Sequence, residues 1–298
     1  MGRLLARAIR SRHWVKNLLL FVPIVAGHRV TELRLVALAA IGFVSFSLAA
    51  SGAYLINDLA DLDSDRKHPS KRERPLPSGE LSIGLAHALA PSLMVAAVAM
   101  AWWTLPSLFT ASLAVYLGIS LAYSAYLKRI VLLDVLVLTA LYCVRIVAGG
   151  LATATFVSPW LLAFSMFLFL SLALVKRYTE LRRLRATPGS NLVMGRGYQP
   201  EDVDLLRTVG PVSGYLAALV LALYINSEAA SRLYRSPIVL WLIVPILIYW
   251  ITRIWLLANR GSVHDDPVVF ATEDRVTYFV GILIAAILIV GTVGRARA

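Results

Sequence analysis

The segment LRLVALAAIGFVSFSLAASGAYLINDLADLDSD, residues 33 to 65, joins a long apolar run to an acidic end. The apolar part, residues 33–57, exceeds the about 20 residues that an α-helix needs to cross the hydrocarbon core of a bilayer. Asn57, Asp61 and Asp65 follow at intervals of four residues, so they share one face if the helix continues. The segment predicts a membrane-spanning helix with oxygen ligands at one end.

The whole chain has the composition of a polytopic membrane protein. Hydrophobic residues make up 59% of its 298 residues, charged residues make up 15%, and the mean hydropathy is +0.73. Soluble domains are near half apolar and about a quarter charged. No polar stretch is long enough for a separate soluble domain. We therefore expect one all-α transmembrane domain over residues 1–298, because helices satisfy their own backbone in lipid.

The apolar runs predict about nine transmembrane helices. The first is short and contains Pro23. The expected spans are 17–27, 33–57, 82–104, 107–127, 131–153, 158–176, 210–227, 236–257 and 276–293. Small residues on the second span favour close contact with neighbouring helices; they are Gly42, Ser45, Ser47, Ala49, Ala50 and Gly52.

Lysine and arginine predict the orientation of the chain. The formal net charge is +12, and in a soluble protein that excess would indicate nucleic acid. Here the basic residues gather in the N-terminal segment and in the loops after even-numbered spans. The positive-inside rule places those parts in the cytoplasm of a multi-pass plasma-membrane protein, and no nucleic-acid partner is expected. An odd number of spans puts Arg295 and Arg297 outside, which conflicts with the rule.

Residues 1–16 are basic and amphipathic, and they lack a cleavage site of small residues behind a short apolar core. We read them as an interfacial helix with Arg3, Arg7 and Arg10 toward anionic lipid, in preference to a removed signal peptide. The one cysteine, Cys143, lies in an apolar run and is expected to be a small buried residue.

The acidic end of the second span predicts a magnesium site. Mg²⁺ takes one or two carboxylates and leaves its other positions to water and substrate phosphate. Asn57, Asp61 and Asp65 are the expected ligands, with Asp58 beside them and Asp63 pointing away. The alternative is a solvated acidic helix end, but acidic residues at a helix C-terminus oppose the helix dipole and repel one another unless a cation is present.

The next segment, HPSKRERPLPSG, begins at residue 68 and supplies the opposite charge. Lys71, Arg72 and Arg74 are typical phosphate ligands, and they follow the acidic residues closely. Positive-inside topology alone is the alternative explanation. Carboxylates and basic groups at one place together predict a Mg²⁺–diphosphate site.

Further polar residues lie at the ends of other spans. Arg145 and Arg253 lie within spans, where a charge is costly and normally faces a polar cavity. Lys176 and Glu180 are four residues apart and form either a surface ion pair or part of a site. Additional charged and polar positions are Lys16, Tyr123, Lys128, Asp134, Arg177, Arg196, Tyr198, His264, Asp265, Asp266, Asp274 and Arg275. Asp265 and Asp266 before Pro267 fit a capping turn equally well.

The sequence Asn57-Asp58-x-x-Asp61-x-x-x-Asp65 behind the second span resembles the UbiA superfamily of intramembrane prenyltransferases, over nearly the whole chain. The resemblance implies a ring of helices around a cavity open to lipid, under a cytoplasmic cap, with Mg²⁺ and a diphosphate at two acidic motifs. A homotrimer is also implied. Members that prenylate aromatic compounds carry a second aspartate-rich motif after span six, where this chain has KRYTE, residues 176–180. A second metal held there by aspartates is therefore not expected.

The motifs HWVKN (13–17), YSxYLK (123–128), KRYTEL (176–181), RGY (196–198) and DDPVVFA (265–271) are similar to the decaprenyl-phosphate phosphoribosyltransferase branch. That branch transfers 5-phosphoribosyl from phosphoribosyl diphosphate (PRPP) to a polyprenyl phosphate and releases diphosphate. Its product feeds decaprenyl-phospho-arabinose and cell-wall arabinan. The resemblance therefore implies a Mg²⁺-dependent pentosyltransferase whose active site faces the cytoplasm.

Under this hypothesis Mg²⁺ lies on Asn57, Asp61 and Asp65, and Asp58, Asp61 and Asp65 act in catalysis. The substrate-binding candidates are Lys16, Lys71, Arg74, Lys128, Lys176 and Arg177 for phosphates, and Tyr123, Glu180 and Tyr198 for ribose. One alternative is an aromatic prenyltransferase of the same superfamily, which would use a prenyl diphosphate. Another is a transporter or scramblase, but its charges should spread through mid-membrane depth.

Overall fold

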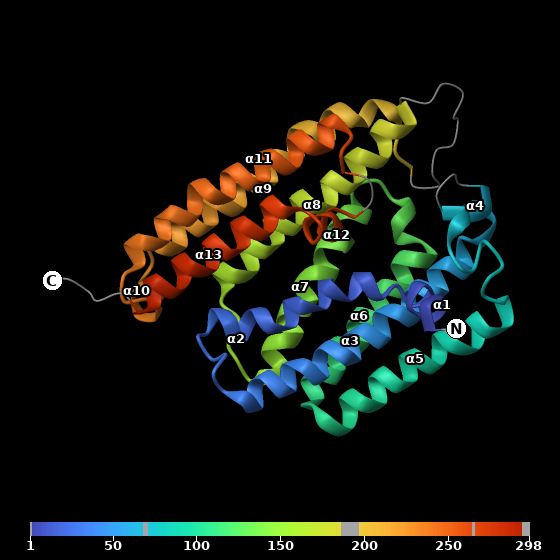
Figure 1. The fold of residues 1–298 in the computed structure, drawn as a ribbon, viewed down its shortest axis with the longest axis horizontal. Coiled ribbons are helices and arrows are strands. Elements are labelled where there is room, and N and C mark those ends of the chain that lie inside the picture. The colour runs from blue at the N-terminus through green and yellow to red at the C-terminus, as the bar shows by residue number, and fades with distance from the viewer. Residues whose placement is uncertain (1, 68–70, 186–196, 264–265, 294–298) are drawn as a thin grey trace. The chain divides into compact units, whose positions relative to one another are not determined.

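The computed structural model describes residues 2–67, 71–185, 197–263 and 266–293. The chain forms two compact units. The N-terminal unit comprises Met1–Val137 and Leu141–Val157, and the C-terminal unit comprises Leu138–Ala140 and Ser158–Ala298. All described regular elements are helices (Figure 1), as the composition predicts.

The N-terminal unit holds the first helices of the chain. They are α1 (Gly2–Ala8), the 3₁₀ helix η1 (Ser11–Phe21), α2 (Val22–Ala26), α3 (Leu33–Ala60), α4 (Leu62–Lys67), η2 (Lys71–Glu73), α5 (Ile83–Thr104), α6 (Ser107–Ala125), η3 (Leu127–Arg129) and α7 (Leu133–Thr153). The C-terminal unit contains α8 (Pro159–Arg185), η4 (Pro200–Asp202), α9 (Val203–Ile225), α10 (Glu228–Leu233), η5 (Pro237–Leu242), α11 (Ile243–Arg260), α12 (Pro267–Ala271) and α13 (Arg275–Val293).

Within the described residues, eight helices are long and apolar enough to cross a membrane. The chain is therefore an all-α polytopic membrane protein. The difference from the expected number lies at residues 17–27. That stretch is divided between η1 and the five-residue α2, which has Pro23 in its first turn. A proline there removes a backbone donor and ends the preceding 3₁₀ run, so no single long helix forms.

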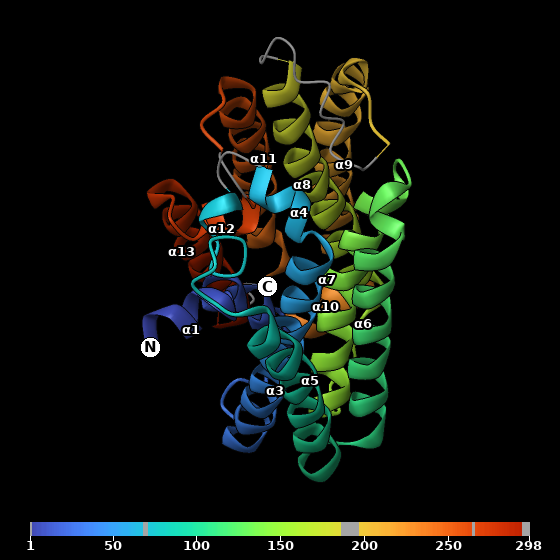
Figure 2. The same cartoon turned by 90° about the vertical axis from the view of Figure 1, so that its right-hand side faces the viewer.

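The helix α3 organises the N-terminal unit. It packs against α5, α6 and η1, and Figure 2 shows α5 beside it. The small residues of the second predicted span are buried on it, which confirms their expected role in close helix contact. At Gly52 an added Cβ would lie 2.7 Å from the carbonyl oxygen of Ala90 on α5, so glycine allows the two backbones to approach.

The segment η1 lies along α3 in the opposite direction. Arg10, just before η1, donates to Asp58 near the end of α3. Trp14 Nε1 donates to Ser51 Oγ over 3.1 Å, and Asn17 Nδ2 donates to Ser47 Oγ over 3.0 Å. Successive polar groups of η1 therefore meet positions progressively farther from the acidic end of α3. Arg10 has a left-handed backbone (φ 52°), which turns the chain between α1 and η1.

Close packing also joins three helices of the C-terminal unit. Ser171 Oγ on α8 donates to the carbonyl oxygen of Gly210 on α9 over 2.8 Å, and Trp255 Nε1 on α11 donates to the same hydroxyl over 3.0 Å. Each buried polar group in this contact has a partner, as burial in an apolar interior requires. The end of α8 that follows this contact carries Lys176, Arg177 and Glu180.

Candidate active site at the end of helix α3

The helix α3 ends inside the predicted acidic motif. Asp61 is its C-cap, with φ −100° and ψ 8°, and α4 begins at the next residue. Backbone bonds from Asp61 N to Asn57 O (3.0 Å) and from Asp65 N to Asp61 O (2.8 Å) continue the helical pattern across this junction. The acidic side chains lie at the negative end of a helix dipole, so cationic partners are required to stabilise them.

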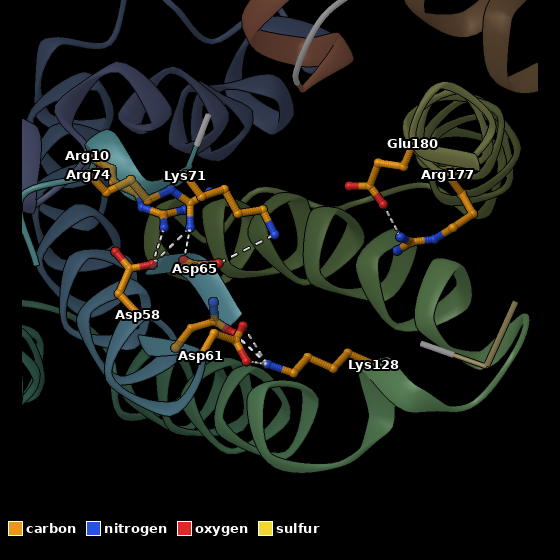
Figure 3. Close-up of polar contacts among 10 residues, drawn as sticks. Arg10, Asp58, Asp61, Asp65, Lys71, Arg74, Lys128, Arg177 and Glu180 are labelled. Atoms are coloured by element: carbon orange, nitrogen blue, oxygen red, sulfur yellow. Dashed lines mark hydrogen bonds and ion pairs between the residues drawn. The ribbon is translucent and has the colours of Figure 1, made fainter. Parts of the chain in front are cut away.

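Asp58 and Asp65 both contact Arg74, and each has one further cationic partner. We call this group the arginine subsite; it comprises Arg10, Asp58, Asp65, Lys71 and Arg74. Arg74 Nη1 donates to Asp58 Oδ1 over 3.2 Å and to Asp65 Oδ2 over 2.7 Å. Arg10 donates to the same oxygen of Asp58, and Lys71 Nζ lies 3.6 Å from Asp65 Oδ1 (Figure 3). Both carboxylates are buried. Three cations surrounding two carboxylates give this subsite a net positive charge.

Asn57 and Asp61 belong to a second group, the lysine subsite, which they form with Lys128 of η3. Lys128 Nζ lies 2.6 and 2.8 Å from the two carboxylate oxygens of Asp61 and 3.3 Å from Asn57 Oδ1. Lys128 is buried, whereas Asp61 is partly exposed. Figure 3 shows Lys128 and the arginine-subsite cations on different carboxylates of the motif.

Burial and charge both act on Arg74. Burial lowers the pKa of Arg74 from its usual value, and the nearby Arg10 guanidinium lowers it further, while Asp58 and Asp65 oppose the shift. Two guanidinium groups therefore repel one another beside the same carboxylate. An anion entering here would relieve that repulsion, because guanidinium groups bind phosphate oxygens well.

The oxygen atoms of the lysine subsite fit a hard divalent cation. The amide oxygen of Asn57 and the carboxylate of Asp61 already converge on one cationic nitrogen. Mg²⁺ uses one or two carboxylates together with phosphate and water oxygens, so this donor set suits it. Across the described residues, no group of three or more His, Cys, Asp and Glu side chains is arranged to hold a metal ion. Asp65 contacts Arg74 and Lys71, although the spacing placed it with Asn57 and Asp61.

Asp63 points away from both subsites, as its place in the helical pattern predicts. Its side chain is 94% exposed and lies 3.9 Å from Arg66 on the same helix. Asp63 therefore offers a control for Asp61 and Asp65, since it has the same charge and lies between them in the sequence.

Two candidate cations lie deeper in the N-terminal unit. Lys16 is buried, with its Nζ 5.5 Å from the ring centroid of Tyr142. Arg145 donates to Asn17 Oδ1 over 2.8 Å, to Tyr116 Oη over 3.0 Å and to the carbonyl of Leu141. These partners of Arg145 are neutral, so its charge is stabilised by dipoles and by the Tyr116 ring, 4.7 Å away.

Tyr123 is partly buried and packs against the hydrophobic cluster that contains Phe46 and Leu113. Asp134 is fully buried in the first turn of α7.

The basic residues that stand in place of a second acidic motif lie on α8, in the C-terminal unit. Arg177 is buried, donates to Glu180 on the next turn, and stacks 5.4 Å above the ring of Tyr198. Lys176 Nζ lies 3.7 Å from Asp266 Oδ2. The sequence suggested that Glu180 pairs with Lys176. In the structure Glu180 contacts Arg177, and Lys176 contacts Asp266. The structure brings Arg177, Glu180 and Tyr198 together, as a candidate phosphate and ribose group.

Asp266 and Asp274 both cap helices. Val268 N donates to Asp266 Oδ1 over 3.1 Å at the start of α12, which confirms the capping turn. Asp274 accepts from Thr277 N over 2.9 Å at the start of α13, and Arg253 reaches it with two nitrogens at 2.7 and 2.9 Å. Burial acts to raise the pKa of Asp274, but the bonds from Arg253 and Thr277 outweigh it and hold that pKa below its usual value. Arg196, His264 and Asp265 lie outside the described residues.

Sequence reasoning missed Arg10 as a site residue. The sequence places it on an interfacial helix with Arg3 and Arg7, but its guanidinium contacts Asp58, 48 residues later. Helical periodicity carries no information about a contact at that separation. Arg7 does stay at the surface, where it lies 2.9 Å from Glu80.

A model of the UbiA prenyltransferase family matches residues 18–283. An uncharacterized protein of Sinorhizobium fredii is 39% identical over 93% of this chain and 54% of its own length, so the chain spans about half of that relative. Decaprenyl-phosphate phosphoribosyltransferase of Mycobacterium tuberculosis is 32% identical, and the alignment covers 98% of this chain and 93% of the relative.

Among solved structures, a UbiA homologue from Archaeoglobus fulgidus bound to GPP and Mg²⁺ has a TM-score of 0.70 at 17% identity, over 96% of this chain and 97% of the other. At that identity the likeness shows the fold alone. Since the family model covers most of the sequence and a relative above 30% identity is aligned over nearly all of both chains, the chain belongs to the UbiA prenyltransferase family.

Proposed function

We propose that this protein transfers 5-phosphoribosyl from PRPP to a polyprenyl phosphate and releases diphosphate, in a Mg²⁺-dependent reaction. The observation that carries the proposal is the excess of positive charge around the acidic motif. Among the described side chains, the three carboxylates of Asp58, Asp61 and Asp65 lie against four cations, Arg10, Lys71, Arg74 and Lys128. A site that receives a ribose 5-phosphate, a diphosphate and a lipid phosphate needs such an excess.

Two further observations support the same choice. The C-terminal unit has Lys176 and Arg177 where an aspartate-rich motif would favour a prenyl diphosphate with a second metal. The relative from Mycobacterium tuberculosis, aligned over nearly the whole chain, has a name that states this reaction type. The same name supports decaprenyl phosphate as the acceptor. The product would then be used for decaprenyl-phospho-arabinose and cell-wall arabinan, as the resemblance of the sequence motifs implies.

The metal would be held by Asn57 and Asp61, with Asp65 close to them in sequence. When bound, Mg²⁺ neutralises the diphosphate and so makes it a better leaving group. The arginine subsite binds phosphate oxygens through Arg10, Lys71 and Arg74, while Asp58 and Asp65 hold these cations in position. Lys128 donates to a phosphate oxygen, and Lys16, Lys176 and Arg177 are further phosphate ligands.

The reaction itself is a substitution at ribose C1. An oxygen of the polyprenyl phosphate forms a bond to C1 as the bond from C1 to the diphosphate oxygen breaks, and C1 has oxocarbenium character in the transition state. The attacking phosphate oxygen is already anionic, so it needs no strong general base. Tyr123, Glu180 and Tyr198 are the proposed contacts of the ribose hydroxyls, with the active site on the cytoplasmic side.

The test uses the purified full chain with two labelled donors. PRPP with polyprenyl phosphate should yield labelled lipid only when Mg²⁺ is present, and a prenyl diphosphate with an aromatic acceptor should yield no product. Asp61→Ala should abolish the turnover of PRPP, whereas Asp63→Ala should leave it within about twofold, because surface substitutions away from a site have small effects. Prenyl transfer without phosphoribosyl transfer would establish the aromatic prenyltransferase alternative and refute the proposal.

A further inference from the structure

We propose that Lys128 occupies the place of the metal ion in the ligand-free protein and passes to a substrate phosphate when the metal and the diphosphate enter together. The inference rests on the metal site of the proposed function, and it assigns to Lys128 a role in the order of binding. Its consequence is that the free protein binds a divalent cation weakly, and the complex with diphosphate binds it well.

The contacts of Lys128 are those of a bound cation. Its Nζ lies 2.6 and 2.8 Å from the carboxylate oxygens of Asp61 and 3.3 Å from Asn57 Oδ1. These are the two neighbouring side chains whose oxygens suit Mg²⁺. The ammonium group therefore neutralises the carboxylate of Asp61 and keeps both oxygen ligands turned toward one point.

The position of Lys128 makes this neutralisation effective. Its side chain is 8% exposed, whereas that of Asp61 is 26% exposed. A buried ammonium needs a counter-ion, because transfer of an unpaired charge from water is costly. Asp61 supplies that counter-ion when no substrate is present. A divalent cation that arrives alone must displace Lys128 and leave it buried beside two added positive charges.

A diphosphate removes this conflict. Its oxygens accept from the lysine and bind the metal at the same time, so both cations gain anionic partners. Lysine suits such a transfer, because its ammonium is a compact charge on a flexible four-carbon stem. The binding of metal and the binding of diphosphate then favour one another, and this coupling is reciprocal by thermodynamic linkage.

Neighbouring Arg129 supplies a matched control. It lies in the same 3₁₀ turn and has the same charge, but it is exposed, and it is Lys128 that contacts Asp61. Replacing either residue removes one positive charge from η3. Only the replacement of Lys128 frees the oxygens of Asn57 and Asp61 for a metal.

The experiment measures the affinity of the full chain in detergent for Mn²⁺, with no donor or acceptor present, by electron paramagnetic resonance of the free ion. Lys128→Met should bind Mn²⁺ about tenfold more tightly than the wild type, within the usual range of coupling between sites. Arg129→Met should change the affinity by less than about twofold, because an exposed charge is screened. Adding Asp61→Asn to Lys128→Met should remove the gain.

A second variant, Lys128→Gln, keeps hydrogen-bond donors toward Asp61 without the charge, and it replaces Lys128→Met should that variant fail to fold. It should also tighten Mn²⁺ binding. The inference is overturned if the folded Lys128 variant binds Mn²⁺ no more tightly than the wild type. It is also overturned if Arg129→Met shows an equal gain, or if no variant binds Mn²⁺.

The transfer assay with labelled PRPP separates this result from the proposed function. A chain that shows the Mn²⁺ gain but transfers no phosphoribosyl group supports the role of Lys128 and refutes the proposed reaction. If the wild-type protein transfers phosphoribosyl but the Lys128 variant binds Mn²⁺ no more tightly, only the role of Lys128 is refuted.

Discussion

Arg10 and Asp58 form an ion pair although 48 residues separate them in the sequence. The pair fixes the beginning of η1 to the end of α3, and it places a third cation beside Lys71 and Arg74. The side chain of Asp58 is almost fully buried in this contact. Arg10 is therefore both an anchor of the N-terminal segment and a candidate ligand for an anion.

Replacing Arg10 should weaken donor binding. We expect Arg10→Met to lower kcat/KM for PRPP about tenfold, mainly through KM, since a hydrogen bond to a charged group contributes about 1.5–3 kcal/mol. Arg10→Lys should recover part of the loss. Initial rates at varied PRPP concentration provide the measurement. Arg7→Met is the control, because the pair between Arg7 and Glu80 is exposed. Equal losses in both variants would assign Arg10 a purely structural role.

Lys176 on α8 should also contribute to the binding of the donor. Lys176→Met is expected to raise the KM for PRPP about tenfold, because a charge-assisted contact to phosphate is lost. Its melting temperature should change little, since the pair of Lys176 with Asp266 is long at 3.7 Å and partly exposed. Arg185→Met removes a charge from the exposed end of the same helix and should leave KM unchanged. A large fall in melting temperature without a change in KM would contradict this prediction.

The pair between Arg253 and Asp274 should make stability depend on pH on the acid side. The pKa of Asp274 is held below its usual value in the folded protein, so folding favours the ionised carboxylate. Its contribution is complete above the pKa of about 4 of an unfolded aspartate and is lost as the pH falls through the lower folded value. Asp274→Asn should lower the melting temperature at pH 7 and flatten its decline toward pH 3. If the melting temperatures of the wild type and of Asp274→Asn fall in parallel as the pH is lowered, this linkage is refuted.

Glycine at position 149 should be essential for the packing of η1. A Cβ there would lie 2.1 Å from the carbonyl oxygen of Leu20, so the backbone must move. We expect Gly149→Ala to cost about 1–3 kcal/mol, as overpacking of a core does. Gly118→Ala on α6 is the control, because its Cβ meets nothing within 4 Å and alanine favours helix over glycine. In the same detergent, the melting temperature should fall below that of the wild type in Gly149→Ala and rise above it in Gly118→Ala.

The helical spacing predicted where several of the acidic residues lie. Asn57 and Asp61 lie at the end of a long apolar helix, and Asp63 points away from them, whereas Asp65 lies on α4 and contacts Lys71 and Arg74. These features follow from local geometry, because residues four apart share a helix face. The buried small residues of α3 also follow from composition, since close helix contact in a membrane favours them.

The division into two subsites was beyond the reach of sequence reasoning. It depends on Arg74 contacting Asp58 and Asp65, and on Lys128 contacting Asp61 from 67 residues away. The 3₁₀ conformation of η1 was also missed. Its mixed polar and apolar composition fits either helix type, and the sequence does not reveal its contacts with Ser47 and Ser51. Periodicity reports which residues share a face, whereas tertiary contacts decide what that face meets.

The antiparallel contact of η1 with α3 has a consequence for biosynthesis. Trp14 and Asn17 leave the ribosome before the serines of α3 to which they donate. A short 3₁₀ segment with unsatisfied polar groups is poorly suited to enter lipid by itself. The N-terminal segment should therefore complete its insertion as a hairpin with α3. In that case the ion pair between Arg10 and Asp58 marks the completion of a membrane-integration step, before any substrate is bound.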